Sequence, residues 1–223
     1  MALHFGNRPI LFRRQISWNS YTSTLGVIPG SRIGNNTDEI STVIKTMDEK
    51  LVKVWDDLRE FCRITNLAHE TSRKISTSLF NEALISTFYK LLNLSYPTEP
   101  LSEALRVGML AFGVTIFLSS KEVKQPYASL IESYRNALLE LKRGSAEMPS
   151  SITLWLLLLW NTLISPQSGL DFSRGWLGEV LVSLNIRSWI EIRKVLKDIM
   201  WVDFMHDEPG RHVIGDVLSS CNN

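Results

Sequence analysis

The sequence predicts a single all-α domain of about seven helices, with two central helices buried on all sides and an extended N-terminal arm. Apolar residues recur at three- and four-residue steps along most of the chain, and no segment has the regular alternation of a strand. Two runs, 105–118 and 152–164, are so apolar that they must lie inside other helices. The 223 residues, of which 44% are apolar, are enough for one well-buried core.

Residues 1–36 are predicted to form the arm. They contain frequent glycine and proline residues, several arginines and scattered aromatic side chains. The segment is more apolar than a typical disordered segment, so two alternatives stay open. The arm is disordered, or it folds back through side chains such as Phe12 and Trp18 to cover a pocket or a partner. Residues 37–223 are the helical domain.

The helical domain follows from the spacing of its apolar residues. The first helix is expected to run from Thr37 to about Thr65, because apolar positions continue without a gap. Further helices are expected over 79–92, 101–118, 127–142, 151–164, 175–184 and 188–205. The run 152–164 has 13 residues, fewer than the roughly 20 that cross a bilayer, so it is interpreted as a core helix and no membrane contact is predicted.

The last of these helices has the clearest end signals. Ser188 followed three residues later by Glu191 predicts a capping box, in which two side chains satisfy free amides of the first turn. Pro209 and Gly210 are expected to end the helical pattern in a turn.

Charge and cysteine content limit the function classes. The chain has 24 Lys and Arg against 23 Asp and Glu, so no strong field favours nucleic acid, and no direct nucleic-acid contact is predicted. The two cysteines, Cys62 and Cys221, indicate neither a disulfide framework nor a zinc site, and an intracellular location, nuclear or cytoplasmic, is expected. Gly-x-Ser-x-Gly, phosphate-binding loops, the Rossmann fingerprint and His-Glu-x-x-His are absent, so no cofactor is predicted.

The segment Met200-Trp201-Val202-Asp203-Phe204-Met205-His206-Asp207-Glu208-Pro209-Gly210 resembles the end of the regulatory domain of fungal Zn2Cys6 transcription factors. Further matching blocks stand upstream in the same order, and the resemblance covers about residues 50–217. These blocks are Asp57-Leu58-Arg59 with Asn66, Leu79-Phe80-Asn81-Glu82, Tyr89-Lys90-Leu91-Leu92, Glu103 to Phe112, Trp155, Trp160 and Trp176-Leu177.

The chain departs from that family in one respect. The DNA-binding zinc cluster needs six closely spaced cysteines, which two distant cysteines cannot supply. The chain is therefore either a fragment of a larger regulator or a freestanding relative without the DNA reader, and the start at Met1 favours the second interpretation. The resemblance implies ligand sensing, dimerisation or co-regulator contact, tied to fungal secondary-metabolite genes.

Two further functions stay open. A freestanding domain of this kind would block a full-length regulator by forming a heterodimer with it through an amphipathic helix. Alternatively, it has become a cofactor-free cyclase, pericyclase or isomerase that orients a polyketide or terpenoid in an apolar pocket.

His206 and Asp203 are the first candidates for chemistry, because their three-residue spacing places both on one helix face. The structural interpretation is preferred: a histidine in the last turn of a helix satisfies terminal carbonyls and interacts well with the helix dipole. Arg106 and Tyr89 complete the catalytic candidates. Arg106 lies in an apolar helix and must pair with a carboxylate, with Glu82 and Glu103 as expected partners, unless it binds an acidic ligand.

Tryptophans are the candidates for an apolar ligand pocket. A helical bundle rich in large aromatic residues either fills its core with them, which is the default, or lines a cavity for an apolar small molecule. The residues in question are Trp155, Trp160, Trp176, Trp189 and Trp201.

Overall fold

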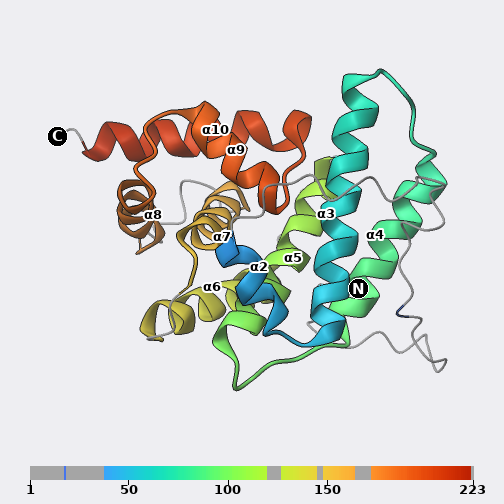
Figure 1. Cartoon of the computed structure of the whole chain (residues 1–223), viewed down its shortest axis with the longest axis horizontal. Coiled ribbons are helices and arrows are strands. Elements are labelled where there is room, and N and C mark those ends of the chain that lie inside the picture. Colours follow the sequence, from blue (N-terminus) through green and yellow to red (C-terminus); the bar gives the residue numbers. More distant parts are fainter. Residues whose placement is uncertain (1–17, 19–37, 120–126, 145–147, 164–171, 222–223) are drawn as a thin grey trace.

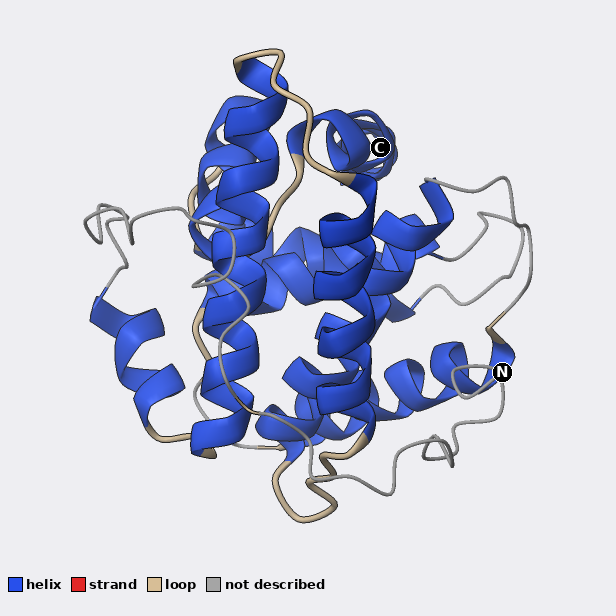
Figure 2. Cartoon of the chain, turned by 90° about the vertical axis from the view of Figure 1, so that its right-hand side faces the viewer, coloured by secondary structure: helices blue, strands red, loops and turns tan. Residues whose placement is uncertain are grey.

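A computed structural model of the chain describes residue 18 and residues 38–119, 127–144, 148–163 and 172–221. All regular secondary structure in these ranges is helical, which confirms the predicted all-α class (Figure 2). The described helices are α2 (Asp38–Lys45), α3 (Glu49–Glu70), α4 (Thr77–Leu92), α5 (Pro100–Ser119), α6 (Ala128–Arg143), α7 (Ser150–Leu163), α8 (Phe172–Ser183), α9 (Trp189–Ile199) and α10 (Asp203–Cys221). The predicted arm, 1–36, lies outside the described residues except for Trp18, whose ring centroid is 5.3 Å from Nζ of Lys50.

Nine helices are described where about seven were expected, because two predicted helices are each divided. The helix predicted over 37–65 breaks at residues 46–48. Asp48 is the N-cap of α3, and its carboxylate accepts hydrogen bonds from the amides of Lys50 (2.8 Å) and Leu51 (3.3 Å). This bonding satisfies amides that a continuous helix would have satisfied with backbone carbonyls.

The last predicted helix is also divided. α9 begins at its Ser188–Glu191 capping box, as predicted, but it ends at Ile199, and Met200 is extended at φ −157° and ψ 111°. α10 then begins at Asp203 and continues through Pro209 and Gly210, so the turn predicted there is wrong. A Cβ added to Gly210 would lie 2.6 Å from the Trp189 ring, so α10 packs directly on that indole, and this contact offsets the missing amide of Pro209.

α5 and α7 are the central buried helices, as predicted. Nine consecutive residues of α7, from Ile152 to Trp160, are buried, so this helix has no solvent-facing side along that stretch. α5 packs against α4, α6 and α7, and Gly108 allows a Leu156 methyl to approach to 2.5 Å of the position a Cβ would take. In Figure 1, α3 and α4 lie on one side of these two helices, and α9 and α10 lie together across one end.

Within the described ranges, one helix is long and apolar enough to span a bilayer, judged by length and composition alone. This is the Pro100–Phe117 part of α5, and 67% of it is buried inside the fold. Such burial is the property of a core helix, since a lipid-facing helix would present its apolar side chains outward.

Candidate functional site

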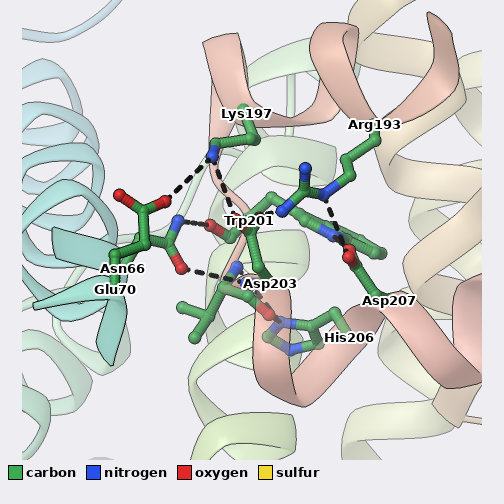
Figure 3. Close-up of polar contacts among 9 residues, drawn as sticks. Asn66, Glu70, Arg193, Lys197, Trp201, Asp203, His206 and Asp207 are labelled. Atoms are coloured by element: carbon green, nitrogen blue, oxygen red, sulfur yellow. Dashed lines mark hydrogen bonds and ion pairs between the residues drawn. The ribbon is translucent and has the colours of Figure 1, made fainter. Parts of the chain in front are cut away.

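The segment between α9 and α10, residues 200–202, is a non-helical linker bonded to distant parts of the fold. Met200, Trp201 and Val202 are buried, and side chains from distant helices bind their backbone. The Trp155 indole donates to the carbonyl of Met200 at 2.8 Å. The Asn66 amide group donates to the carbonyl of Trp201 at 2.8 Å and accepts from the backbone N–H of Asp203 at 2.9 Å (Figure 3). The linker's backbone is thereby satisfied without a helix.

His206 lies in the first turn of α10, not in the last turn of a helix, so the predicted C-terminal capping role is wrong. Its side chain is 2% exposed and stacks on Phe112 with ring centroids 5.1 Å apart. The Thr115 hydroxyl, which lies 2.7 Å from the Phe112 carbonyl, is 2.9 Å from Nε2 of His206. Nδ1 lies 3.0 Å from the Val202 carbonyl oxygen and 3.3 Å from the Val202 amide nitrogen, so Val202 can bind this ring nitrogen in either tautomer.

Burial decides the protonation of His206. Desolvation lowers its pKa to about 4, against smaller opposing contributions from the Val202 backbone and the charge of Asp203. The imidazole is therefore neutral at pH 7, and hydrogen-bond partners lie at both of its nitrogens.

Asp203 takes part in an ion-pair network and does not hydrogen-bond with His206. Its Oδ2 accepts from Arg193 and from Lys197, the latter at 2.9 Å, both on α9. Asp207 continues the network: its Oδ1 accepts from the Trp201 indole at 2.8 Å, and its Oδ2 lies 2.9 Å from Nε of Arg193. Figure 3 shows these side chains joining α9 to the first turns of α10. The spacing of Asp203 and His206 thus produces no acid–base pair.

Arg106 pairs with Glu103, one of the two partners expected, and not with Glu82. Nε of Arg106 donates to Oε2 of Glu103 at 2.8 Å, and Nη1 donates to the Leu91 carbonyl at 3.3 Å. Burial opposes ionisation of Glu103, but its hydrogen bond and charge interaction with Arg106 outweigh burial, so the pKa of Glu103 lies below its ordinary value.

The catalytic candidates do not converge. Arg106 and Thr115, the α5 partner of His206, are nine residues apart on one helix, which is roughly 14 Å along its axis. Tyr89 lies on α4, half-buried, and its carbonyl accepts from the side chain of Asn93.

The tryptophans divide into two groups. Trp155, Trp160 and Trp201 are at most 1% exposed and fill the core, where Trp155 meets Trp55 edge to face at a centroid distance of 6.2 Å. Trp176 and Trp189 are partly exposed. Each lies beneath a cation: Lys142 Nζ is 5.3 Å from the Trp176 ring, and the Arg211 guanidinium is 5.8 Å from the Trp189 ring.

Sequence reasoning assigned no role to Asn66, Thr115 or the ion pair of Lys90 and Asp57. Lys90 is 2% exposed, and its Nζ lies 2.9 Å from Oδ2 of Asp57 on α3. A signal was present for this pair, because Lys90 falls on the inward face of an apolar helix, where a cation needs a carboxylate. Asn66 belongs to a block of the family resemblance, but neither Asn66 nor Thr115 has a local signal for its bonding role, because their partners are 137 and 91 residues away.

Among the described residues, no group of three or more His, Cys, Asp or Glu side chains could hold a metal ion. Cys62 is buried, and burial raises the pKa of its thiol. No protein-family model, curated protein or solved structure matches the chain.

Proposed function

We propose that this chain is a regulatory domain of the fungal transcription-factor type, without a zinc cluster, which acts by contacting other proteins. The observation that supports it is that the blocks of the sequence resemblance meet one another in space. Asn66 binds the Trp201–Asp203 segment, and Trp155 binds Met200. The residues that carry the resemblance therefore contact one another within one core, as those of a shared architecture would.

A second pair of blocks behaves in the same way. Asp57 and Lys90, which belong to two separate blocks, form the buried ion pair between α3 and α4. The resemblance therefore concerns the residues that hold one domain together, which favours a shared architecture over an isolated motif.

The position of the polar candidates favours regulation over catalysis. Arg106 is bound to Glu103 and to the Leu91 carbonyl of α4, Asp203 to two cations of α9, and His206 to Thr115 and Val202, so each is engaged in contacts within the fold. Three of the five candidate pocket tryptophans fill the core. These contacts favour a partner bound at the outer surface over a substrate bound among these residues.

The test is a tethering experiment. The full chain is fused to an unrelated DNA-binding domain in a fungal host, and transcription from a promoter with the matching sites is measured against the DNA-binding domain alone. We expect a several-fold change in either direction. Trp155→Ala, which empties the core, is expected to abolish the change, whereas Gly215→Ala, at a position with open space around it, is expected to leave it intact.

An unchanged reporter, with a fusion protein shown to be expressed and helical, would contradict the regulatory proposal. A nuclear location and a link to secondary-metabolite genes belong to the same proposal and are tested by imaging the tagged chain and by transcript levels after its deletion.

A further inference from the structure

The loop between α3 and α4, residues 71–76, exposes two cations followed by a serine. Arg73, Lys74 and Ser76 are all exposed. Neither cation forms an ion pair with a described residue. α3 ends at Glu70, the Arg73 amide still donates to the Ala68 carbonyl at 2.8 Å, and Ser76, at φ −59° and ψ 127°, directly precedes α4.

We propose that Ser76 is a phosphorylation site for a basophilic serine/threonine kinase that binds Arg73 and Lys74, three and two residues before the acceptor. Kinases choose substrates by charge pattern, and carboxylates in the kinase cleft would bind these two cations. In an extended chain, three residues span about 10 Å, so the basic side chains and the acceptor hydroxyl occupy separate subsites along the cleft.

The transfer itself is the ordinary kinase reaction. The Oγ of Ser76 attacks the γ-phosphorus of ATP, a new O–P bond forms, and the bond to ADP breaks. The hydroxyl proton passes to the catalytic aspartate of the kinase. The reaction needs only ATP, magnesium and the kinase.

A similar sequence elsewhere in the chain lacks these properties. Lys142-Arg143-Gly144-Ser145 also places two cations before a serine, but Lys142 and Arg143 belong to the last turn of α6, and Arg143 pairs with Glu140. Helical residues rise only about 1.5 Å each, so this pair is not presented in an extended form. The described structure therefore favours the α3–α4 loop over the end of α6.

A phosphate on Ser76 is compatible with the fold. Ser76 is the N-cap of α4, its side chain makes no capping hydrogen bond, and the first turn of α4 carries no acidic residue. The free amides of the first turn and the helix dipole favour a negative charge at this position. Phosphorylation is therefore expected to leave the helical content unchanged and the melting temperature equal or higher.

The experiment incubates the full chain with the catalytic subunit of cyclic-AMP-dependent protein kinase and MgATP, and maps phosphopeptides over time by mass spectrometry. We expect phosphate on Ser76, none on that peptide in Ser76→Ala, and a rate roughly tenfold lower in the double variant Arg73→Ala, Lys74→Ala, because two charge-assisted contacts are lost. The matched variant Lys142→Ala, Arg143→Ala should leave the rate at Ser76 unchanged.

Three results would overturn the proposal: no phosphate on Ser76, an unchanged rate without Arg73 and Lys74, or faster labelling of Ser145 than of Ser76.

Discussion

His206 shows how a residue that looks catalytic in sequence is used structurally. Both ring nitrogens are bonded, one to Thr115 of α5 and one to Val202 just before its own helix, and the ring stacks on Phe112 and contacts Trp201 at a tilted angle. A general base must reach a substrate proton, but this imidazole is 2% exposed. Its surroundings fix a neutral ring between helices, and protonation would place a charge in an apolar site.

The stability of the protein should therefore fall in mild acid through His206. The pKa is lowered to about 4 in the folded chain, from an ordinary value of 6.5, so between these values the unfolded chain binds a proton that the folded chain rejects. The penalty is absent above pH 6.5 and grows as the pH falls toward 4. Between pH 7 and pH 5 we expect a loss of about 2 kcal/mol from this residue, measured by urea unfolding.

The control for this effect is His206→Gln, which cannot be charged. The variant should start less stable at pH 7, because its amide replaces an aromatic ring that fills the site. It should then lose about 2 kcal/mol less than the native chain between pH 7 and pH 5. An equal loss in both proteins would assign the acid sensitivity to other groups.

Asn66 is the residue on which the linker between α9 and α10 depends most directly. It is 8% exposed, and its amide group bonds to both the Trp201 carbonyl and the Asp203 amide. Asn66→Ala leaves both backbone groups without these partners, so we expect a loss of about 2 to 3 kcal/mol in the free energy of unfolding. Asn66→Asp keeps the acceptor but loses the donor, and its charge adds to that of Asp203, so it should be no better than alanine in urea titrations at pH 7. A loss well below 1 kcal/mol in either variant would mean that water replaces the side chain.

At the scale of the element, the sequence predicted helix positions well and helix breaks poorly. The capping box at Ser188 was predicted because all of its signals are local. The break at Met200–Val202 was not, because three apolar residues continue the helical spacing while distant side chains, Trp155 and Asn66, bind their backbone. Periodicity detects which residues are buried, and it does not distinguish a buried helix from a buried extended linker.

Pro209 illustrates the opposite error. Proline followed by glycine usually marks the end of a helix, but α10 continues through both residues. The unfavourable helix propensity of the two residues is outweighed by the packing of α10 on Trp189 and Trp201. That packing involves residues of α9 and the linker, whose positions depend on the whole fold. The bonding of His206 and Asp203 could not be predicted for the same reason, because their partners, Thr115 and Asn66, are far away in sequence.

α10 offers a matched pair of glycines for testing this packing. A Cβ on Gly210 would lie 2.6 Å from the Trp189 ring and 3.2 Å from the Trp201 ring, whereas a Cβ on Gly215 meets nothing within 4 Å. Gly210→Ala should therefore destabilise the protein by about 1 to 3 kcal/mol through overpacking. Gly215→Ala should stabilise it by up to about 1 kcal/mol, because alanine favours a helix. Both are measured by thermal or urea unfolding.

The two glycine variants contradict the packing argument if they shift stability in the same direction. Changed near-ultraviolet circular dichroism in Gly210→Ala alone would locate the strain at the indole rings, since Gly215 is exposed and touches no tryptophan.

At the scale of the whole molecule, the described helices share one hydrophobic core. Buried residues from all nine described helices belong to a single cluster, with α7 in contact with α5, α8, α9 and α10. Because the core is not divided, no described helix is expected to stay folded when the rest of the core unfolds. We therefore expect the described part of the chain to unfold in one transition, although its length is above the usual range for two-state behaviour.

Tyr134→Phe tests this expectation at the contact between α6 and α7, away from the linker. The Tyr134 hydroxyl on α6 donates to the Leu156 carbonyl on α7 at 2.8 Å, and the ring is fully buried. Its removal should lower the free energy of unfolding by about 1 kcal/mol. If the core is one unit, the urea midpoints followed by tryptophan fluorescence and by far-ultraviolet circular dichroism fall together, and the losses in Tyr134→Phe and Asn66→Ala add in the double variant, because the two sites share no partner. A circular dichroism midpoint that falls alone in Tyr134→Phe would show that α6 separates before the core opens.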